Sequence, residues 1–240
     1  MSIPRKFRNL ASDLGLWGAS LYGLDRLANR LRLPIRIRSY LIVAQPVPDR
    51  PWLSPGRGHQ FTLRPIGPSD PALEEMPLDA ETRAFRFEQG ARCYGLFKGD
   101  TLAAYLWFQF GTYREDEVRC DFEPQPDSIT AWDFDVYVRP EFRLGRAFLR
   151  LWDLANAELA ARGIQYSVSR ISAFNLASIR SHRRLGATVI GRADFLTLGR
   201  MQVLRSNLSP RFHISLGARS RPRVLVSRVV PDGAAPKAEG

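Results

Sequence analysis

The chain has 240 residues, of which 45% are hydrophobic and 25% charged, so it can bury the core of one globular domain with extensions. Its 35 Lys and Arg residues outnumber 24 Asp and Glu residues, and the net charge of +11 favours anionic partners such as nucleic acid, acidic lipid or a nucleotide phosphate. No apolar run approaches the roughly 20 residues that span a bilayer, and the N-terminus lacks the pattern of a signal peptide. Cys93 and Cys120 have neither metal-ligand nor disulfide-scaffold spacing. We therefore expect a cytoplasmic protein.

The first segment of the chain is basic and amphipathic. From Leu10 to Leu31 apolar residues recur at steps of three or four, which predicts a helix that ends before Pro34. Eight Lys and Arg residues lie between Met1 and Arg38. Such a helix either contacts an anionic membrane through residues 10–33, at the inner membrane surface, or packs its apolar stripe on its own domain.

Composition divides the chain into three parts. A short strand is expected at Tyr40–Ala44, and a linker with four prolines follows it. We expect an N-terminal segment at 1–58, the main domain at 59–205 and a basic extension at 206–240. The extension has one expected strand, Arg223–Val229, and its last ten residues are expected to be disordered.

The first half of the main domain alternates between strand and helix patterns, with Asp79 placed to cap the helix. The loop in this half includes an expected edge strand at Val118–Phe122. The predicted elements are a strand at Phe61–Pro65, a helix at Leu78–Gln89, a hairpin of Cys93–Phe97 and Leu102–Phe110, and a loop at Arg114–Ser128.

The second half continues in the same alternation, so the order is mixed α/β. The predicted elements are a strand at Ile129–Val138, a helix from about Gly145 to Arg162, a strand at Gln165–Ser169, a helix at Leu176–Leu185, and strands at Thr188–Gly191 and Asp194–Leu198.

A basic turn joins the strand at 129–138 to the helix that follows. It contains Gly145 between Arg143 and Arg146. Free N–H groups at a helix N-terminus bind anions, and a glycine lets a pyrophosphate approach the backbone closely. Taken alone, this turn is weak evidence, because many α/β proteins have a similar one.

A second motif makes the pattern specific. Asn175, Ser178, His182, Leu185 and Gly186 form N-x-x-S-x-x-x-H-x-x-L-G directly after a predicted strand. Together with the basic turn, this motif resembles GNAT acyltransferases, and the resemblance covers Phe61 to about Leu204. It implies an α/β (α+β) fold with a mixed, mostly antiparallel central sheet, a splayed strand pair and flanking helices. It also implies acetyl-CoA or another acyl-CoA as donor and an amine or hydroxyl acceptor on a small molecule or sugar.

The resemblance assigns roles to individual residues. The backbone of Val136 and Val138 would bind the pantetheine, and Asn175, with Ser178, would hydrogen-bond it or shape its exit. Two departures from the family pattern stand out: the first basic residue of the turn comes one position late, and His182 occupies a place that often holds a proton-donating Tyr. The pyrophosphate would be cradled by Arg143, Leu144, Gly145, Arg146 and Ala147.

Catalytic residues are expected on the strand at 129–138. Alternation places Asp133, Asp135 and Tyr137 on one face, where burial and mutual repulsion would raise one carboxyl pKa toward that of a useful base. The same face would otherwise be solvated or paired with arginines. His182 is the expected general acid, with Tyr137 as the alternative, unless His182 only packs on its helix.

Two other functions remain open: a basic nucleic-acid or membrane-surface binding protein, and an inactive GNAT-like module that binds acyl-CoA. Nucleic acid is not expected, because aromatic residues such as Phe134 and Trp152 occupy core positions rather than a basic surface. No metal is expected either, since the three histidines do not cluster with one another or with cysteine.

Overall fold

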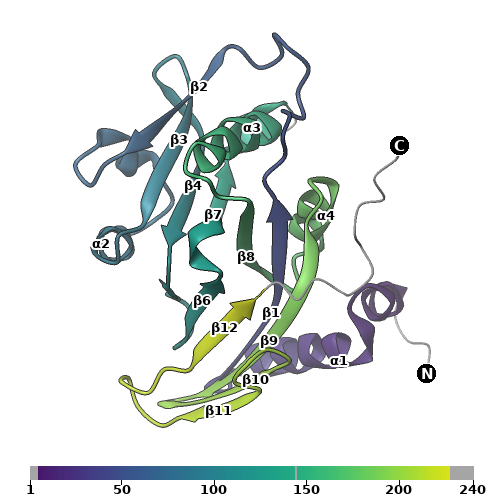
Figure 1. The fold of residues 1–240 in the computed structure, drawn as a ribbon. Coiled ribbons are helices and arrows are strands. Elements are labelled where there is room, and N and C mark those ends of the chain that lie inside the picture. Colours follow the sequence, from purple (N-terminus) through teal and green to yellow (C-terminus); the bar gives the residue numbers. More distant parts are fainter. Residues whose placement is uncertain (1–4, 144, 228–240) are drawn as a thin grey trace, which may run out of the picture.

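The computed structural model describes residues 5–143 and 145–227 (Figure 1). Leu144 and the last ten residues, for which we made predictions, lie outside this range. In the described part, the helices are α1 (Arg5–Arg30), α2 (Ala80–Glu88), α3 (Ala147–Ala160) and α4 (Leu176–Arg184). The strands are β1 (Ile35–Pro46), β2 (Phe61–Ile66), β3 (Arg92–Lys98), β4 (Thr101–Phe110), β5 (Tyr113–Arg114), β6 (Asp121–Gln125), β7 (Thr130–Val138), β8 (Tyr166–Ser172), β9 (Thr188–Leu198), β10 (Met201–Ser206), β11 (Phe212–Ser215) and β12 (Arg223–Ser227).

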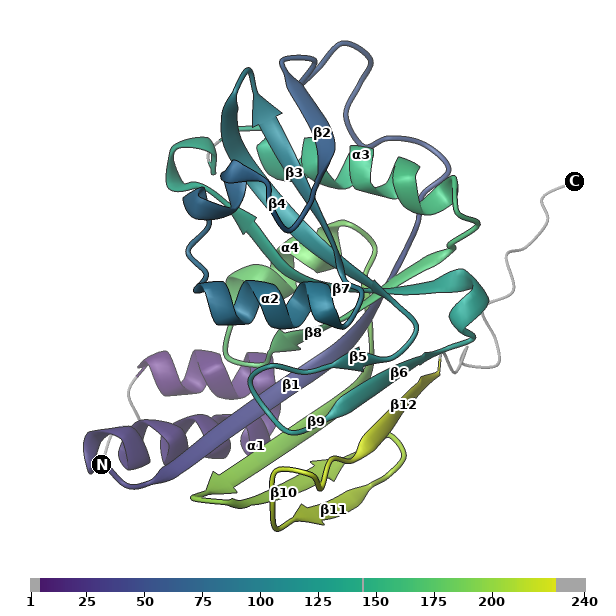
Figure 2. The ribbon, with the colours of Figure 1, turned by 90° about the vertical axis from the view of Figure 1, so that its left-hand side faces the viewer.

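A large twisted sheet organises the described residues. Its strand order is β11-β10-β9-β1-β8-β7-β4-β3-β2, and within it β7 and β8 are parallel while the other neighbours are antiparallel. A smaller sheet has the order β12-β6-β5. Figure 2 shows α2 and α3 on opposite sides of β3 and β4. The predicted fold class, with its mostly antiparallel sheet and flanking helices, is confirmed.

Two apolar layers form the core, one on each face of the strands β3, β4 and β7. On one face Leu151 and Trp152 of α3 pack on Leu106 and Phe108 of β4. The other face packs under α2 and the small sheet, and Trp107 lies within it. Because successive side chains on a strand point to opposite faces, the apolar runs in these central strands fill both layers.

Strands β10 and β11 were not predicted, and strand β1 is longer than predicted. It spans Ile35–Pro46 rather than Tyr40–Ala44, and it pairs with β8 on one side and with β9 on the other. A strand with neighbours on both edges satisfies its backbone groups along its whole length, which extends it beyond its most apolar residues. The boundary near residue 58 stays a prediction, but β1 on its N-terminal side is part of the main sheet.

Helix α1 begins earlier than predicted and is interrupted at Gly15, whose φ of 69° and ψ of 168° are not helical. It packs on the sheet through small residues, since Ala19 and Ala28 are buried. The apolar stripe that defined the helix in sequence faces elsewhere: Leu24 and Leu27 are about half exposed, at 53% and 51%.

Several other elements have different bounds in the structure than in the prediction. Strand β9 is one continuous element, because its pairing with β1 runs through the place where a break was predicted. The expected edge strand at Val118–Phe122 is β6, which is shifted to Asp121–Gln125 and pairs with β12. The predicted cap of α2 is confirmed: Asp79 Oδ1 accepts a hydrogen bond of 2.7 Å from the Thr82 N–H.

Candidate functional site

The candidate site lies where β7 and β8 diverge. The two strands pair only over Thr130–Trp132 and Tyr166–Val168, after which β7 continues along β4 and β8 along β1. On the side that faces β8, the β7 backbone beyond Trp132 therefore has no strand partner. This is the splayed pair that the resemblance implied.

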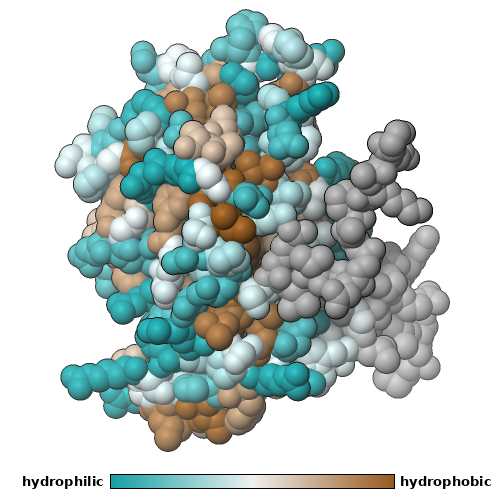
Figure 3. All heavy atoms as spheres, viewed as in Figure 1, coloured by the Kyte–Doolittle hydropathy of each residue, from teal (hydrophilic) through white to brown (hydrophobic). Residues whose placement is uncertain are grey.

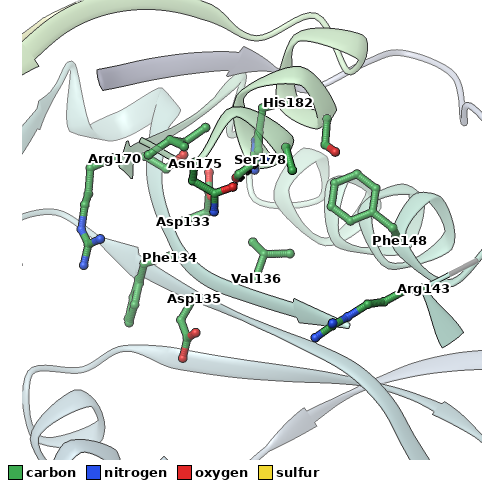
Figure 4. A pocket seen from close by; sticks show the side chains of 14 residues that line it. Asp133, Phe134, Asp135, Val136, Arg143, Phe148, Arg170, Asn175, Ser178 and His182 are labelled. Carbon is green, nitrogen blue, oxygen red and sulfur yellow. Dashed lines mark hydrogen bonds between the residues drawn. The ribbon is translucent and has the colours of Figure 1, made fainter. Parts of the chain in front are cut away.

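A cavity of about 480 Å³ opens in the splay, lined by β7, β8, Phe148 of α3 and α4 (Figure 4). A second cavity, also of about 480 Å³, continues it along β7 toward the start of α3. The two share Val136, Arg143, Phe148 and Ser181 as lining residues. Together they form a cleft that runs from the centre of the sheet to the basic turn before α3.

A bulge in β7 sets the directions of its side chains. The pairing with β4 shifts register between Tyr105 and Trp107, and Asp135 has a φ of 51°. Such a left-handed residue breaks the alternation of a strand and turns the following side chains to the other face.

The predicted common face of Asp133, Asp135 and Tyr137 is therefore wrong. Asp135 and Tyr137 lie on the same side as Trp132 and Phe134, where Tyr137 stacks on Tyr105 at 5.4 Å between ring centroids. Asp133 points the other way, into the cleft (Figure 4).

Asp133 is a buried carboxyl with a raised pKa. Its side chain accepts a hydrogen bond of 2.5 Å from Ser167 Oγ on β8. Burial raises the pKa of Asp133 to about 7, and the hydroxyls of Ser167 and Ser169 lower it in part. Repulsion from Asp135 does not contribute, since that carboxylate faces away. A cleft-lining group that titrates near neutrality suits a general base.

Asp135 is instead held in an ion-pair network. Its carboxylate accepts from Arg86 Nη1 at 2.5 Å, and Arg86 also binds Asp116 at 2.9 Å. Arg86 is 6% exposed, and its guanidinium also lies over the rings of Trp107 and Phe134. This arrangement matches the arginine-paired alternative for the acidic face. Asp135 also lines the first cavity, but its carboxylate is already paired with Arg86, which disfavours a role as base.

His182 lines the cleft, but it is buried against aromatic rings, and this burial determines its protonation. It is 6% exposed and meets the rings of Trp152 and Phe148 edge to face, at 5.7 and 6.4 Å between centroids. Burial lowers the pKa of His182 to about 4. The imidazole is therefore neutral at pH 7, and Nδ1 has no hydrogen-bond partner among the described residues. A neutral imidazole is a weak proton donor. Tyr137, the alternative donor, stacks on Tyr105 but also lines the second cavity, toward the start of α3.

Asn175 and Ser178 have a structural role that explains their spacing. Asn175 is the N-cap of α4, and its Oδ1 accepts from the Ser178 N–H at 3.1 Å. Both residues also line the cleft (Figure 4). Their predicted contact with pantetheine stays a prediction.

The basic turn leads into an open helix N-terminus. Helix α3 begins at Ala147, two residues later than predicted, and no side chain caps it. Arg143 Nε donates to the Val138 carbonyl at 2.9 Å, and its guanidinium lies over Tyr137. Arg146 is exposed. A Cβ added at Gly145 would meet only the Phe142 carbonyl oxygen, at 3.5 Å, so the protein itself leaves this space free.

These residues fit a nucleotide diphosphate attached to a narrow chain. The uncapped N–H groups and the arginines suit a diphosphate, and the unpaired edge of β7 suits an amide-bearing chain such as pantetheine. Sequence reasoning missed Ser167, Ser169 and Arg86. The alternating serines of the strand 166–172 are a visible signal of a polar face, whereas nothing in the sequence marks Arg86 as buried.

The described residues contain no group of three or more His, Cys, Asp or Glu side chains that could hold a metal ion. None of the described helices is long and apolar enough to cross a membrane.

Comparisons with known proteins support the fold. No family model matches the sequence, and no curated protein does. Among solved structures, a conserved protein of unknown function from Staphylococcus epidermidis ATCC 12228 has a TM-score of 0.50 at 10% identity, over 72% of this chain and 66% of that one. This similarity shows the fold alone.

Two other similar structures are a tandem GNAT protein from the clavulanic acid biosynthesis pathway and a GCN5-related N-acetyltransferase from Sphaerobacter thermophilus. The first has a TM-score of 0.46 at 19% identity, over 67% of this chain and 53% of that one. The second has a TM-score of 0.46 at 18% identity, over 71% and 54%. The chain thus spans about half the length of these two proteins. Both of these proteins are described as GNAT or GCN5-related proteins.

Proposed function

We propose that the chain is a GNAT-type acyltransferase, which moves an acetyl or other acyl group from an acyl-CoA to an amine or hydroxyl acceptor. The observation that supports this most strongly is the cleft between β7 and β8. It combines an unpaired strand edge, a buried carboxyl with a pKa of about 7 and an open, basic helix N-terminus. Each of these features suits one part of an acyl-CoA reaction.

The donor would lie along the cleft. Backbone groups of Val136 and Val138 would bind the amides of pantetheine, with Asn175 at its side. The N–H groups at the start of α3 would hold the diphosphate, assisted by Arg143, Arg146 and the predicted contact of Leu144. When bound, the donor supplies a thioester carbonyl as the electrophile.

The side chains of the cleft would move the protons. Asp133, whose pKa is raised to about 7, accepts a proton from the acceptor amine or hydroxyl, directly or through one water. The acceptor nitrogen or oxygen forms a bond to the thioester carbon, and the bond from that carbon to sulfur breaks. Backbone N–H groups near the bulge stabilise the negative oxygen. Tyr137 donates a proton to the departing thiolate.

Binding is tested by thermal denaturation with acetyl-CoA and longer acyl-CoAs. A ligand at 100 times its Kd stabilises the native state by about 2.7 kcal/mol, so the melting temperature rises. Arg146→Glu should weaken binding about tenfold or more, while Arg200→Glu, which changes an exposed arginine remote from the cleft, serves as the matched control. The absence of any shift with every acyl-CoA would contradict the proposal.

Turnover is tested by release of free CoA thiol with panels of amines, amino acids and sugars. Release that depends on an acceptor identifies an enzyme, whereas binding without release on any panel indicates an inactive acyl-CoA binding module. Salt-sensitive DNA binding that is indifferent to CoA would favour the nucleic-acid alternative. A small-molecule or sugar acceptor, a cytoplasmic location and peripheral membrane contact through residues 10–33 stay predictions.

A further inference from the structure

An apolar surface lies outside the cleft, on the sheet face that α1 covers only in part. On this face, side chains from neighbouring strands stand side by side: Ile37 of β1, Leu196 of β9, Val203 of β10 and Ile214 of β11 occupy one row. Leu196 and Ile214 are 41% and 47% exposed. Figure 3 shows apolar residues gathered at the lower end of the molecule, where Figure 1 places β10 and β11.

The orientation of α1 adds leucines to the same surface. Trp17 Nε1 donates to Asp194 of β9 at 2.8 Å, and Arg205 of β10 lies over the Trp17 ring at 4.3 Å. Leu24 follows Trp17 by seven residues and therefore shares its side of α1. That side is turned toward β9 and β10, next to the uncovered sheet face. Leu31 directly follows the helix, and its N–H donates to the Leu27 carbonyl at 2.9 Å.

We name this region the α1–β11 surface. It consists of large apolar side chains that are between 41% and 60% exposed: Leu24, Leu27, Leu31, Leu196, Leu198, Phe212 and Ile214. Soluble monomers seldom expose so many neighbouring large apolar side chains, and such patches mark contact sites.

Arginines border this surface. Arg30 and Arg32 lie at the end of α1, Arg200 lies in the turn after Leu198, and Arg211 precedes β11; all four are exposed. None of them forms an ion pair with a carboxylate among the described side chains. Of the acids near this surface, Asp194 is bound by Trp17 and Arg192, and Asp25 of α1 accepts a hydrogen bond from Asn29.

We propose that the α1–β11 surface docks the protein on an anionic lipid bilayer. Apolar side chains inside a rim of unpaired arginines match the acyl region and the negative headgroups of such a bilayer. A second copy of the chain fits less well, because a two-fold interface would bring the arginine rims of both copies against each other. This proposal does not depend on the acyltransferase proposal, since no residue of the cleft takes part.

The test is co-flotation of the full chain with vesicles of phosphatidylglycerol and phosphatidylcholine at 1:1, compared with vesicles of phosphatidylcholine alone. We expect at least tenfold stronger binding to the anionic vesicles, and a loss of this binding as salt is raised. Equal binding to both vesicle types, or binding to neither, would overturn the proposal.

Variants locate the contact. Leu198→Ser with Ile214→Ser, and separately Leu27→Ser with Leu31→Ser, should each weaken binding to anionic vesicles at least tenfold. Leu225→Ser is the matched control, because Leu225 is 42% exposed on β12 and lies outside the surface. Equal weakening in the control, or unchanged binding in both double variants, would refute the assignment.

Sedimentation of the lipid-free protein tests whether the α1–β11 surface binds a second copy of the chain instead. We expect a monomer in the wild type and in both double variants at vesicle-assay concentrations. A dimer that dissociates in the Leu198→Ser, Ile214→Ser variant would show that this surface binds a second copy, and would overturn the membrane proposal. Acyl-CoA binding, measured in parallel, should be the same in all of these proteins.

Discussion

Ser167 Oγ of β8 donates a hydrogen bond of 2.5 Å to Asp133 Oδ1 of β7, beside the short stretch over which these two parallel strands pair. The bond ties the cleft's buried carboxyl to the point where the strands begin to separate. It also stabilises the ionised form of Asp133, against the burial that raises its pKa to about 7. The first three predictions follow from this balance.

Asp133→Asn should lower kcat about 10² to 10⁴-fold, the usual contribution of a general base, with a smaller effect on donor affinity. In the wild type, the rate should rise with pH and reach half its maximum near pH 7, because Asp133 accepts a proton only when ionised. The pH–rate profile checks this. A wild-type rate that is flat from pH 5 to pH 8.5 would rule out Asp133 as the base.

The same variant should change stability in a pH-dependent way. The pKa of Asp133 is higher in the folded than in the unfolded state, so the wild type loses stability as pH rises from about 4 to about 7. Asp133→Asn removes this loss, and its stability relative to wild type should be greater at pH 8 than at pH 5, by about 1 to 4 kcal/mol. Urea unfolding at the two pH values measures this, and no difference between them would contradict the burial effect.

Ser167→Ala should raise the pKa of Asp133 further, because the ionised carboxylate loses a hydrogen-bond donor. The pH at which the rate reaches half its maximum should increase by about one unit, with little change in the maximal rate. Ser227→Ala on β12 is the control. A fall in rate at all pH values without a change in the pH of half-maximal rate would indicate a positional role instead.

His182→Phe should lose less stability than the wild type when the pH is lowered from 7 to 4. The pKa of His182 is lowered to about 4 in the folded protein, so between pH 6.5 and pH 4 the unfolded state takes up a proton that the folded state does not. The free energy of unfolding of the wild type therefore falls as pH falls from 6.5 toward 4. Relative to wild type, the variant should therefore gain up to about 3 kcal/mol between pH 7 and pH 4. Denaturant titrations at both pH values test this; parallel stabilities would mean that His182 protonates freely.

Arg86→Leu should destabilise the fold by about 3 to 5 kcal/mol, because it leaves Asp135 and Asp116 without their shared partner. The double variant Arg86→Leu, Asp135→Asn should recover part of that loss. Denaturant unfolding of both single variants and the double variant gives the coupling energy. Additive effects would show that the buried pair does not act as a unit.

Gly145→Val should fold normally and bind acyl-CoA at least tenfold more weakly. A Cβ at this position meets only the Phe142 carbonyl oxygen at 3.5 Å, so the protein tolerates it, but it fills space that a diphosphate would use. Calorimetric titration with acetyl-CoA measures the affinity, and the melting temperature without ligand checks the fold. Unchanged affinity would place the diphosphate elsewhere.

The sequence by itself determined most of the central elements and their order, although it did not predict β10 and β11. Period-2 and period-3.6 patterns located the central strands and helices, Asp79 marked the start of α2, and the two motifs around Gly145 and Asn175 identified the cleft-forming elements. These signals are local, because each depends on neighbours within a few residues of the chain.

Only the tertiary structure decided the chemistry inside the cleft. The left-handed Asp135 arises opposite a register shift with β4, and it sends Asp133 and Asp135 to opposite faces although their spacing predicted one face. Burial by Trp152 and Phe148 makes His182 a neutral side chain. The central place of β1 likewise depends on β8 and β9, which follow more than a hundred residues later. Contacts between distant segments set burial and strand register, and no local pattern encodes them.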